Sequence, residues 1–239
     1  LALHGHGPGK AIPAGFPCDV KGRAIDIAGE RDYAVQAAQR GYVALAPDQL
    51  GFGELMLDED LTRDQGSSCQ QLAMRCMMAG TTAIGQRVLQ AMVCFDYLSS
   101  LPEVDSGRLV VMGQSGGGTT SLFTGALDER VWATVVSCYF CTFRHSILAM
   151  HHCVCNYVPH LYRFAEMYDI AALVAPRLLY IISGRQDPIF PRSGVQLALQ
   201  RIREVYDALG TPDNLGYYEG PEGHRFYAAE VWEWLARRV

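Results

Sequence analysis

The chain has 239 residues, of which 49 % are hydrophobic and 19 % charged, a composition typical of a globular domain with a large core. Its formal net charge of −5 contains no block of like charge, which argues against nucleic-acid and anionic-membrane partners. No apolar run approaches the roughly 20 residues that span a bilayer. We therefore expect one domain over residues 1–239.

Short apolar runs alternate with helical patterns, which predicts βα units around a mostly parallel sheet of about six strands. Residues 54–80 show no clean period, so we expect an irregular excursion with a short helix. Residues 139–172 form an insertion rich in aromatic residues, His and Cys, which we expect to act as a pocket wall or lid. The predicted strands are 1–3, 42–46, 109–112, 133–138, 177–183 and 215–218, and the predicted helices are 30–40, 85–101, 116–127, 193–209 and 226–238.

The segment Val110–Gly118 reads as a strand, a sharp turn and a helix of small residues. Its turn carries the pattern G-x-S-x-G, which places Ser115 as a nucleophile at the top of a strand. Side chains at Gly113 and Gly117 would collide where strand and helix meet. A phosphate-binding loop is the alternative, but the sequence lacks G-x-x-x-x-G-K-[ST]. We predict that Ser115 is the nucleophile.

A serine nucleophile needs a base, and the base needs an orienting acid. Asp187 follows the predicted strand 177–183, and His224 follows the predicted strand 215–218. Both lie at the carboxyl edge of the sheet, in the order Ser, acid, His. Alternatively, Asp187 forms a turn before Pro188 and His224 is a capping or surface residue. The joint order favours a triad.

The oxyanion of an acyl-transfer reaction needs two N–H donors. Gly116 follows the nucleophile, and the loop His4–Gly7 follows the first strand. We predict the N–H groups of Gly116 and His6 as donors, with Gly5 permitting the turn. The expected substrate-binding residues are His6, Gly5, Gly116, Gln114, Tyr139 and Phe140. For the aromatic residues of the insertion, simple packing onto the body is an equal alternative.

Eight cysteines occur, at positions 18, 69, 76, 94, 138, 141, 153 and 155. A domain of this size needs no disulfides, so buried free thiols are expected. Two alternatives stay open: a disulfide using Cys153 or Cys155, and a zinc site using Cys138-x-x-Cys141 with His151-His152-Cys153-x-Cys155. His4 and His6 have no third ligand in reach by sequence. We expect no metal and no cofactor.

The chain resembles bacterial α/β-hydrolases of the group near acetyl xylan esterases and dienelactone hydrolases. The resemblance implies the α/β-hydrolase fold, the triad Ser115, Asp187 and His224, and an esterase-type activity. It departs from the family in lacking the usual first two strands, so that 42–46 becomes a sheet edge. We expect another subunit, giving a homo-oligomer, or a local segment to cover this edge. The segments that carry the resemblance are His4–Gly7, Ala46–Asp48, Gly51–Gly53, Gly113–Gly118, Ala126–Arg130, His151–Pro159, Asp169–Ala171, Ala175–Arg177, Asp187–Pro188 and Gly223–His224.

The predicted function is hydrolysis of small acyl esters through an acyl-enzyme, with sugar esters favoured by analogy alone. Two alternatives to an esterase stay open, one that uses the same triad and one that uses no catalytic residue. The triad would also serve a peptidase or amidase, and a non-catalytic hydrolase fold would serve as a binding module. No signal peptide is visible, which favours a cytoplasmic location without deciding the compartment, since a leader could have been removed.

Overall fold

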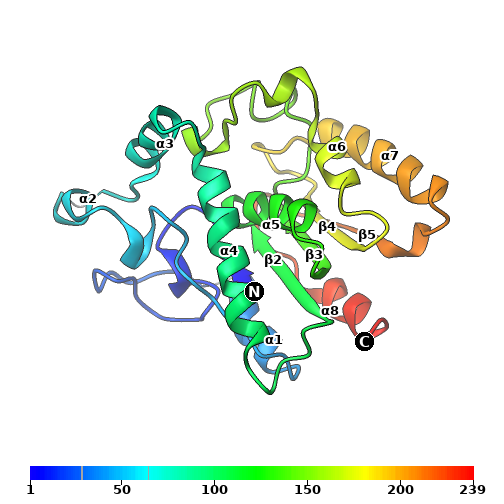
Figure 1. Ribbon diagram of the computed structural model, residues 1–239, viewed down its shortest axis with the longest axis horizontal. Helices are drawn as coiled ribbons and strands as arrows, with labels where there is room; N and C mark the ends of the chain where they lie inside the picture. The colour runs from blue at the N-terminus through cyan, green and yellow to red at the C-terminus, as the bar shows by residue number, and fades with distance from the viewer. Residues whose placement is uncertain (28, 64) are drawn as a thin grey trace.

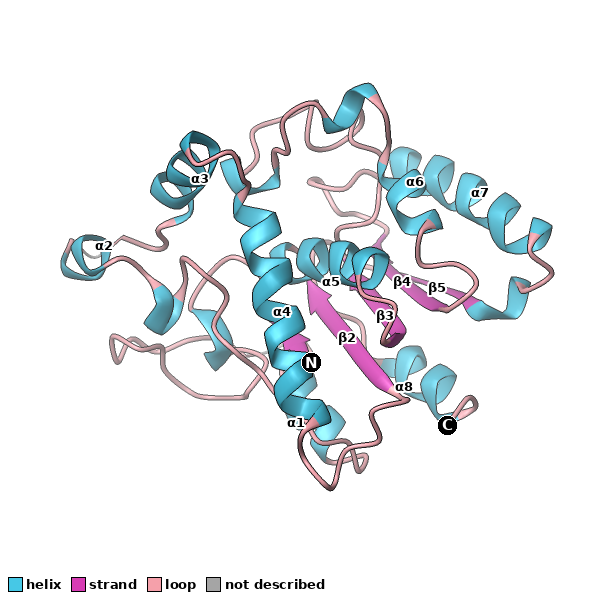
Figure 2. Cartoon of the chain, in the orientation of Figure 1, coloured by secondary structure: helices cyan, strands magenta, loops and turns pink. Residues whose placement is uncertain are grey.

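The computed structural model describes residues 1–27, 29–63 and 65–239, and it places helices on both faces of one parallel sheet (Figures 1 and 2). The strands pair in their chain order, β1-β2-β3-β4-β5, and every pairing is parallel. The described part of the chain thus has five strands, where about six were expected. Their bounds are Ala2–Leu3 (β1), Leu109–Gln114 (β2), Val131–Ser137 (β3), Leu178–Gly184 (β4) and Leu215–Gly220 (β5).

The helices follow the predicted order, with differences of a few residues at their ends. The excursion 54–80 contains two α-helices rather than one short helix. Short 3₁₀ turns occupy Gly9–Ala11, Gly53–Leu55, Val154–Asn156, Leu161–Arg163 and Pro212–Asn214. The α-helices are Tyr33–Ala38 (α1), Asp58–Thr62 (α2), Cys69–Met78 (α3), Ala83–Ser99 (α4), Gly116–Leu127 (α5), Met167–Ala172 (α6), Arg192–Ala208 (α7) and Ala229–Ala236 (α8).

The two faces of the sheet are covered by different helices because side chains alternate along each strand. Val135 and Tyr180 face a core cluster shared with α1 and α8. Their neighbours Val136 and Ile181 face a second cluster shared with α5, α6 and α7. In Figure 1, α4 and α5 cross in front of the strands, and α8 lies lower in the view. Both faces of the central strands are therefore buried, as in other parallel sheets.

The segment 42–46 differs from its prediction. It forms no strand in the structure. Its neighbour is β1, whose Ala2 N–H donates a hydrogen bond to the Leu45 carbonyl of the segment, 2.8 Å away. Val43 is 44 % exposed, so the run is not covered on both faces. The predicted homo-oligomer through this segment stays a prediction.

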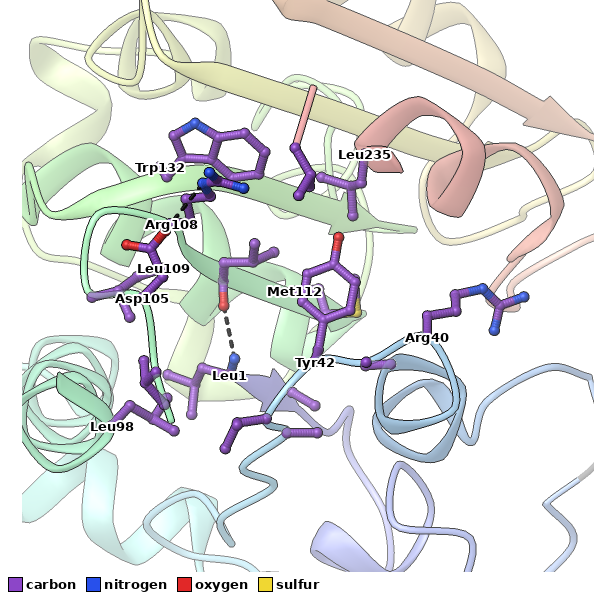
Figure 3. Close-up of a pocket in the computed structure, with 18 of the residues that line it drawn as sticks. Leu1, Arg40, Tyr42, Leu98, Asp105, Arg108, Leu109, Met112, Trp132 and Leu235 are labelled. Carbon is purple, nitrogen blue, oxygen red and sulfur yellow. Dashed lines mark hydrogen bonds and ion pairs between the residues drawn. The ribbon is translucent and has the colours of Figure 1, made fainter. Parts of the chain in front are cut away.

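A pocket of about 750 Å³ lies beside this segment, at the amino-terminal ends of β1 and β2 (Figure 3). Tyr42, Trp132 and Leu235 border it, and the Leu1 amino group donates to the Val110 carbonyl at its floor, 2.7 Å away. The pocket contains none of the predicted catalytic residues, which follow the opposite ends of the strands. Its size is therefore no guide to where the chemistry occurs.

The insertion begins at Cys138, where a positive φ of 47° turns the chain away from β3. It runs along the top of the view in Figure 1, between α3 and α6. Most of residues 139–166 is turn or loop, with two 3₁₀ turns. The carboxyl ends of β2, β3 and β4 point toward this segment. No helix in the described ranges is long and apolar enough to cross a membrane.

Candidate active site

Ser115 lies in a strained turn between β2 and α5, with φ 55° and ψ −117°. A non-glycine residue with positive φ is uncommon and marks a conformation held by its surroundings. The Ser115 N–H donates to the Ser137 carbonyl at 2.8 Å, which ties the turn to the end of β3. The turn lifts the side chain off the strand end and begins α5 at Gly116. This is the strand–turn–helix setting that the sequence predicted.

The glycines around this turn allow three backbones to meet. A Cβ on Gly113 would overlap the backbone of Gly117, as predicted. A Cβ on Gly117 would overlap the Leu3 carbonyl of β1, so the second glycine is needed for a different contact than expected. The backbone of β1 therefore lies directly against the start of α5.

Asp187 and His224 meet through a hydrogen bond of 2.7 Å between Nδ1 and Oδ2. Asp187 is buried, and its other carboxylate oxygen accepts the N–H groups of Ile189 at 2.9 Å and Phe190 at 3.2 Å. The carboxylate therefore has a fixed orientation. The Phe190 ring stacks against the His224 ring with centroids 5.8 Å apart, which limits rotation of the imidazole. The sequence placed both residues at this edge, and the structure brings them into contact.

Two backbone bonds hold the loop of His224 against the turn of Asp187. Arg185 N–H donates to the Gly220 carbonyl at 2.8 Å, and Gln186 N–H donates to the Glu222 carbonyl at 2.9 Å. A Cβ on Gly184 would overlap the Gly223 carbonyl, so the residue that ends β4 must be small. The acid and the base thus sit on two segments that are joined independently of their side chains.

The predicted oxyanion donors are neighbours. A Cβ built on Gly116 would lie 2.6 Å from His6 Nδ1 and 3.5 Å from the His6 backbone nitrogen. Gly5 lies against the turn, because its Cβ would come within 3.1 Å of the Gln114 carbonyl and 3.4 Å of the Ser115 Cβ. Its φ is not in the left-handed region, so close approach rather than the turn explains this glycine.

A buried network that sequence reasoning missed holds the His4–Gly7 loop. The Gln49 amide donates to the His4 carbonyl at 2.5 Å, and its oxygen accepts the Thr120 hydroxyl of α5 at 2.5 Å. The His4 Nε2 accepts the Gln49 N–H at 2.9 Å, and Nδ1 donates to the Gly5 carbonyl at 2.7 Å. Desolvation by burial lowers the pKa of His4 to about 4, so its ring stays neutral. His4 is part of the loop's support.

Asp48 supports the same loop from below. Its carboxylate accepts the N–H groups of Lys10 at 2.7 Å and Glu54 at 3.0 Å. Side chains at Gly9 or Gly53 would overlap that carboxylate. The motifs Ala46–Asp48 and Gly51–Gly53 therefore anchor the chain at Gly9 and Lys10, directly after the His4–Gly7 loop, a role that no sequence pattern indicated.

A pocket of about 280 Å³ opens beside Ser115. Tyr139, His152 and Phe190 line it together with His6 and Gly116. Three predicted substrate-binding residues, Gly5, Gln114 and Phe140, are not among the residues that line it. Phe140 is buried in the core cluster of α5 and α7, and the Gln114 amide reaches the His224 carbonyl at 3.5 Å.

Polar groups occur on the pocket wall. Thr119 Oγ1 donates to Asn156 Oδ1 at 3.3 Å, and the Tyr139 hydroxyl is buried without a hydrogen-bond partner among the described residues. His152 shares a bond of 3.1 Å with the Ser146 hydroxyl, and desolvation lowers the pKa of its ring. The wall therefore combines apolar rings with polar groups.

Cys138 lies with Asp187 and His224 in a group whose ligand atoms are within 4.8 Å of one another. Burial raises the pKa of the Cys138 thiol to about 12, and the Sγ donates to the Arg225 carbonyl at 3.1 Å. Cys138 also lies apart from Cys153 and Cys155, so the zinc site suggested by Cys138-x-x-Cys141 is not assembled.

A different group of possible ligands includes a residue of the His4–Gly7 loop, which we call the oxyanion loop after its predicted role. We call this group the cysteine cluster. Its four ligand atoms also lie within 4.8 Å of one another. The thiols of Cys153 and Cys155 lower the pKa of Cys69, the first residue of α3. The sequence did not single out Cys69, because it lies in the segment 54–80 that shows no period. The members of the cysteine cluster are His6, Cys69, Cys153 and Cys155.

A family model described as "Abhydrolase family" matches residues 19–234. The chain belongs to this family. The abhydrolase is 26 % identical over 189 residues to YtaP of Bacillus subtilis (strain 168), a protein provisionally named a hydrolase, covering 77 % of the chain and 60 % of YtaP. It is 31 % identical over 134 residues to "Carbohydrate esterase MZ0003" of an unknown prokaryotic organism, covering 48 % of the chain and 31 % of that protein.

One solved structure supports the fold. The crystal structure of a protein from Bacteroides fragilis NCTC 9343, provisionally titled an acetyl xylan esterase, superimposes with a TM-score of 0.83 at 20 % identity. The match covers 100 % of the abhydrolase and 71 % of that chain. The α/β-hydrolase fold expected from the sequence is thereby confirmed. The abhydrolase spans less than two thirds of the two curated relatives named above.

Proposed function

We propose that this abhydrolase is a serine carboxylic ester hydrolase that acts on small acyl esters through an acyl-enzyme. The observation that carries the proposal is the buried Asp187 carboxylate bonded to His224 at 2.7 Å, at the same edge of the sheet as Ser115 in its strained turn. An imidazole held in one tautomer by a carboxylate is the arrangement that activates a serine hydroxyl. Its setting at the carboxyl edge of the sheet agrees with where α/β folds bind ligands.

The reaction follows from the roles of these groups. His224 accepts the proton of Ser115 as its Oγ forms a bond to the ester carbonyl carbon. The N–H groups of His6 and Gly116 donate to the developing oxyanion. His224 then gives the proton to the leaving alkoxide, and the carbon–oxygen bond of the ester breaks. Water enters, loses a proton to His224, and releases the acid from Ser115, while Asp187 stabilises the imidazolium.

The pocket supports a small acyl group. Its volume of about 280 Å³ lies at the lower limit for sites that enclose drug-sized ligands. Hydroxyl and amide groups of Thr119 and Asn156 on its wall suit a hydroxyl-rich alcohol such as a sugar. The names of MZ0003 and of the Bacteroides fragilis protein agree with a carbohydrate ester. We therefore propose acetylated carbohydrates as the substrate class.

Replacement of the nucleophile tests the proposal. Ser115→Ala is expected to reduce kcat for p-nitrophenyl acetate and for acetylated xylo-oligosaccharides by about 10⁶-fold, as for other triads that lose the serine. A fluorophosphonate probe should label the unchanged protein once and the variant not at all. Melting temperature serves as the control for folding. Unchanged acetate hydrolysis by Ser115→Ala would overturn the proposal.

Substrate choice needs separate assays on the unchanged protein. Acetate esters should be cleaved faster than butyrate and octanoate esters of the same alcohol, because the pocket is small. Faster cleavage of an aminoacyl amide than of the matched ester would replace the esterase by an amidase. Absence of both turnover and probe labelling would leave a binding module.

A further inference from the structure

The cysteine cluster lies outside the predicted triad and has no role in the reaction as proposed. Its ligands come from three separate segments: the oxyanion loop, the first residue of α3, and the insertion. His6 Nε2 lies 3.2 Å from Cys155 Sγ, and Cys155 Sγ lies 3.1 Å from Cys153 Sγ. Three thiols and an imidazole converging on one point from distant parts of the chain are seldom a packing accident.

The chemistry of this set matches a closed structural zinc site. Tetrahedral Zn²⁺ with three Cys ligands and one His ligand is a standard structural type. Two thiolates at about 2.3 Å from such an ion are about 3.8 Å apart, and no two ligand atoms here are more than 4.8 Å apart. Small rotations of the side chains would open the 3.1 Å separation between Cys153 and Cys155 to this value. Soft thiolate ligands favour zinc over magnesium or calcium.

A buried arginine supplies an independent sign of negative charge at the cluster. Arg87 of α4 is 3 % exposed, and its guanidinium lies 3.1 Å from Cys69 Sγ. Its other hydrogen bonds go to the Leu50 carbonyl, and no carboxylate pairs with it among the described ion pairs. A buried guanidinium needs a compensating anion. Zinc with three thiolates and a neutral imidazole carries one negative charge, which Arg87 would balance.

The shell around the cluster is built to keep the ligands in place. Phe52 packs its ring edge-on to His6, with centroids 5.2 Å apart, and also lies under the Arg87 guanidinium. Ala73 and Ala83 complete the apolar wall around Cys69 and Cys155. This apolar side shields Cys69 and Cys155, whereas His6 and Cys153 also line the pocket beside Ser115. Cys69 lies at the start of α3, where the helix dipole favours a thiolate.

We propose that the cysteine cluster binds one Zn²⁺ ion, which fixes the oxyanion loop and the insertion to α3. The ion has no direct part in the reaction, since all four positions are filled by protein ligands. Its consequence for turnover rests on the proposed esterase function, because His6 also supplies a predicted oxyanion donor. The zinc content of the protein does not depend on the esterase function. An absence of zinc and an absence of esterase activity can therefore be told apart.

Metal analysis of the purified protein tests the site directly. Protein expressed with added Zn²⁺ and desalted should contain one zinc per chain by mass spectrometry of the metal. Cys69→Ser and Cys153→Ser should bind Zn²⁺ at least about 100-fold more weakly, more than is lost when only a supporting residue of a metal site is replaced. Cys76→Ser is the matched control, because Cys76 is buried on the same helix and lies outside the cluster. It should retain one zinc.

Two further readouts cover variants that fail to fold. Cobalt(II) exchanged into the unchanged protein should show thiolate-to-cobalt charge transfer and the intense visible bands of tetrahedral coordination. Titration of thiols under denaturing, chelating conditions should find all eight cysteines free. A count of six, from a disulfide within the cluster, would overturn the proposal. So would a protein without zinc and without cobalt bands, or an equal zinc content in Cys69→Ser and Cys76→Ser.

Discussion

The two halves of the candidate active site are built differently. Ser115, Asp187 and His224 each follow a strand of the sheet, and backbone bonds between neighbouring strand ends set their spacing. His6 and the pocket wall lie on irregular segments, whose positions depend on buried side chains such as Gln49 and on the cysteine cluster. The positions of the proposed triad are therefore set by the backbone of the sheet, whereas the positions of His6 and the pocket wall depend on a few side-chain contacts.

This difference predicts two kinds of variant. We call Ser115, Asp187, His224 and the strand ends that carry them the sheet side; a side chain replaced there should remove a chemical function and leave the geometry intact. We call His6, the pocket wall and the irregular segments that carry them the loop side. A replacement there, far from the triad, should disturb geometry and reduce turnover by a smaller factor, because a displacement near 1 Å costs about 100-fold. The three substitutions below test that division, from the largest expected effect to the smallest.

Asp187→Asn tests the sheet side. The amide cannot accept the Nδ1 proton of His224 as the carboxylate does, so the imidazole adopts the wrong tautomer, and kcat for acetate esters should fall by about 10⁴-fold. The bonds from Ile189 and Phe190 to the side-chain oxygen can persist, so the melting temperature should change little. Steady-state kinetics and calorimetry check both parts. A loss below tenfold would show that His224 is oriented by other contacts.

Gln49→Leu tests the loop side. It removes the bonds to the His4 carbonyl and the Thr120 hydroxyl at nearly constant volume, so the loop that carries His6 loses its tie to α5. We expect kcat to fall by about 10- to 100-fold, less than the loss of an entire oxyanion donor would cost in the worst case. Gln86→Leu on α4 is the control, since Gln86 bonds only Thr81 through its amide. Equal kinetics of the two variants would contradict the division.

Asp128→Asn tests whether sheet-side stability can change without a change in chemistry. The Arg130 guanidinium bonds the buried Asp128 carboxylate at 2.7 and 2.9 Å and holds its pKa below the usual range. A lowered folded-state pKa means that stability is present at neutral pH and is lost as pH falls through that pKa. The variant should therefore be less stable by about 1–3 kcal/mol at pH 7, with a difference that shrinks below about pH 4.

Urea unfolding at several pH values measures this difference, and kcat at pH 7 should be unchanged. Asp105→Asn is the matched control, since Asp105 pairs with Arg108 on the surface and is 60 % exposed. Exposed pairs contribute about 0–1 kcal/mol. If the Asp128 variant matched this control, the carboxylate at the end of α5 would have no structural role.

The sequence predicted the sheet side because its signals are local. Ser115 lies in a pentapeptide that only a strand–turn–helix unit explains, and Asp187 and His224 each follow an apolar run. The strands β2 to β5 and the helices α5 and α7 accordingly appear within a few residues of their predicted ends, whereas α6 lies in the insertion and was not predicted. The strand expected at 42–46 is absent, because an apolar run predicts burial and does not by itself predict backbone pairing. Leu45 of this segment accepts a backbone bond from Ala2 of β1.

The loop side could not be predicted because its contacts join residues far apart in the chain. Gln49 reaches Thr120, and Cys69 reaches Cys155, with no periodicity or spacing to signal either contact. The notable pattern Cys138-x-x-Cys141 pointed to the wrong pair of cysteines. Cys153-x-Cys155 was visible in the sequence, but its ligand partners His6 and Cys69 were not. Only the folded chain brings these residues together.

The contact of Gly117 with the Leu3 carbonyl has a consequence for how this scaffold can vary. It joins β1 to the nucleophile turn directly, although more than a hundred residues of chain separate them. Segments looped out between these two points and away from the cysteine cluster, such as α2, can grow or shrink without moving Ser115. New binding loops could therefore be grafted near residues 62–63 and 65–66, where the chain is exposed, to change which esters gain access while the proposed triad keeps its geometry.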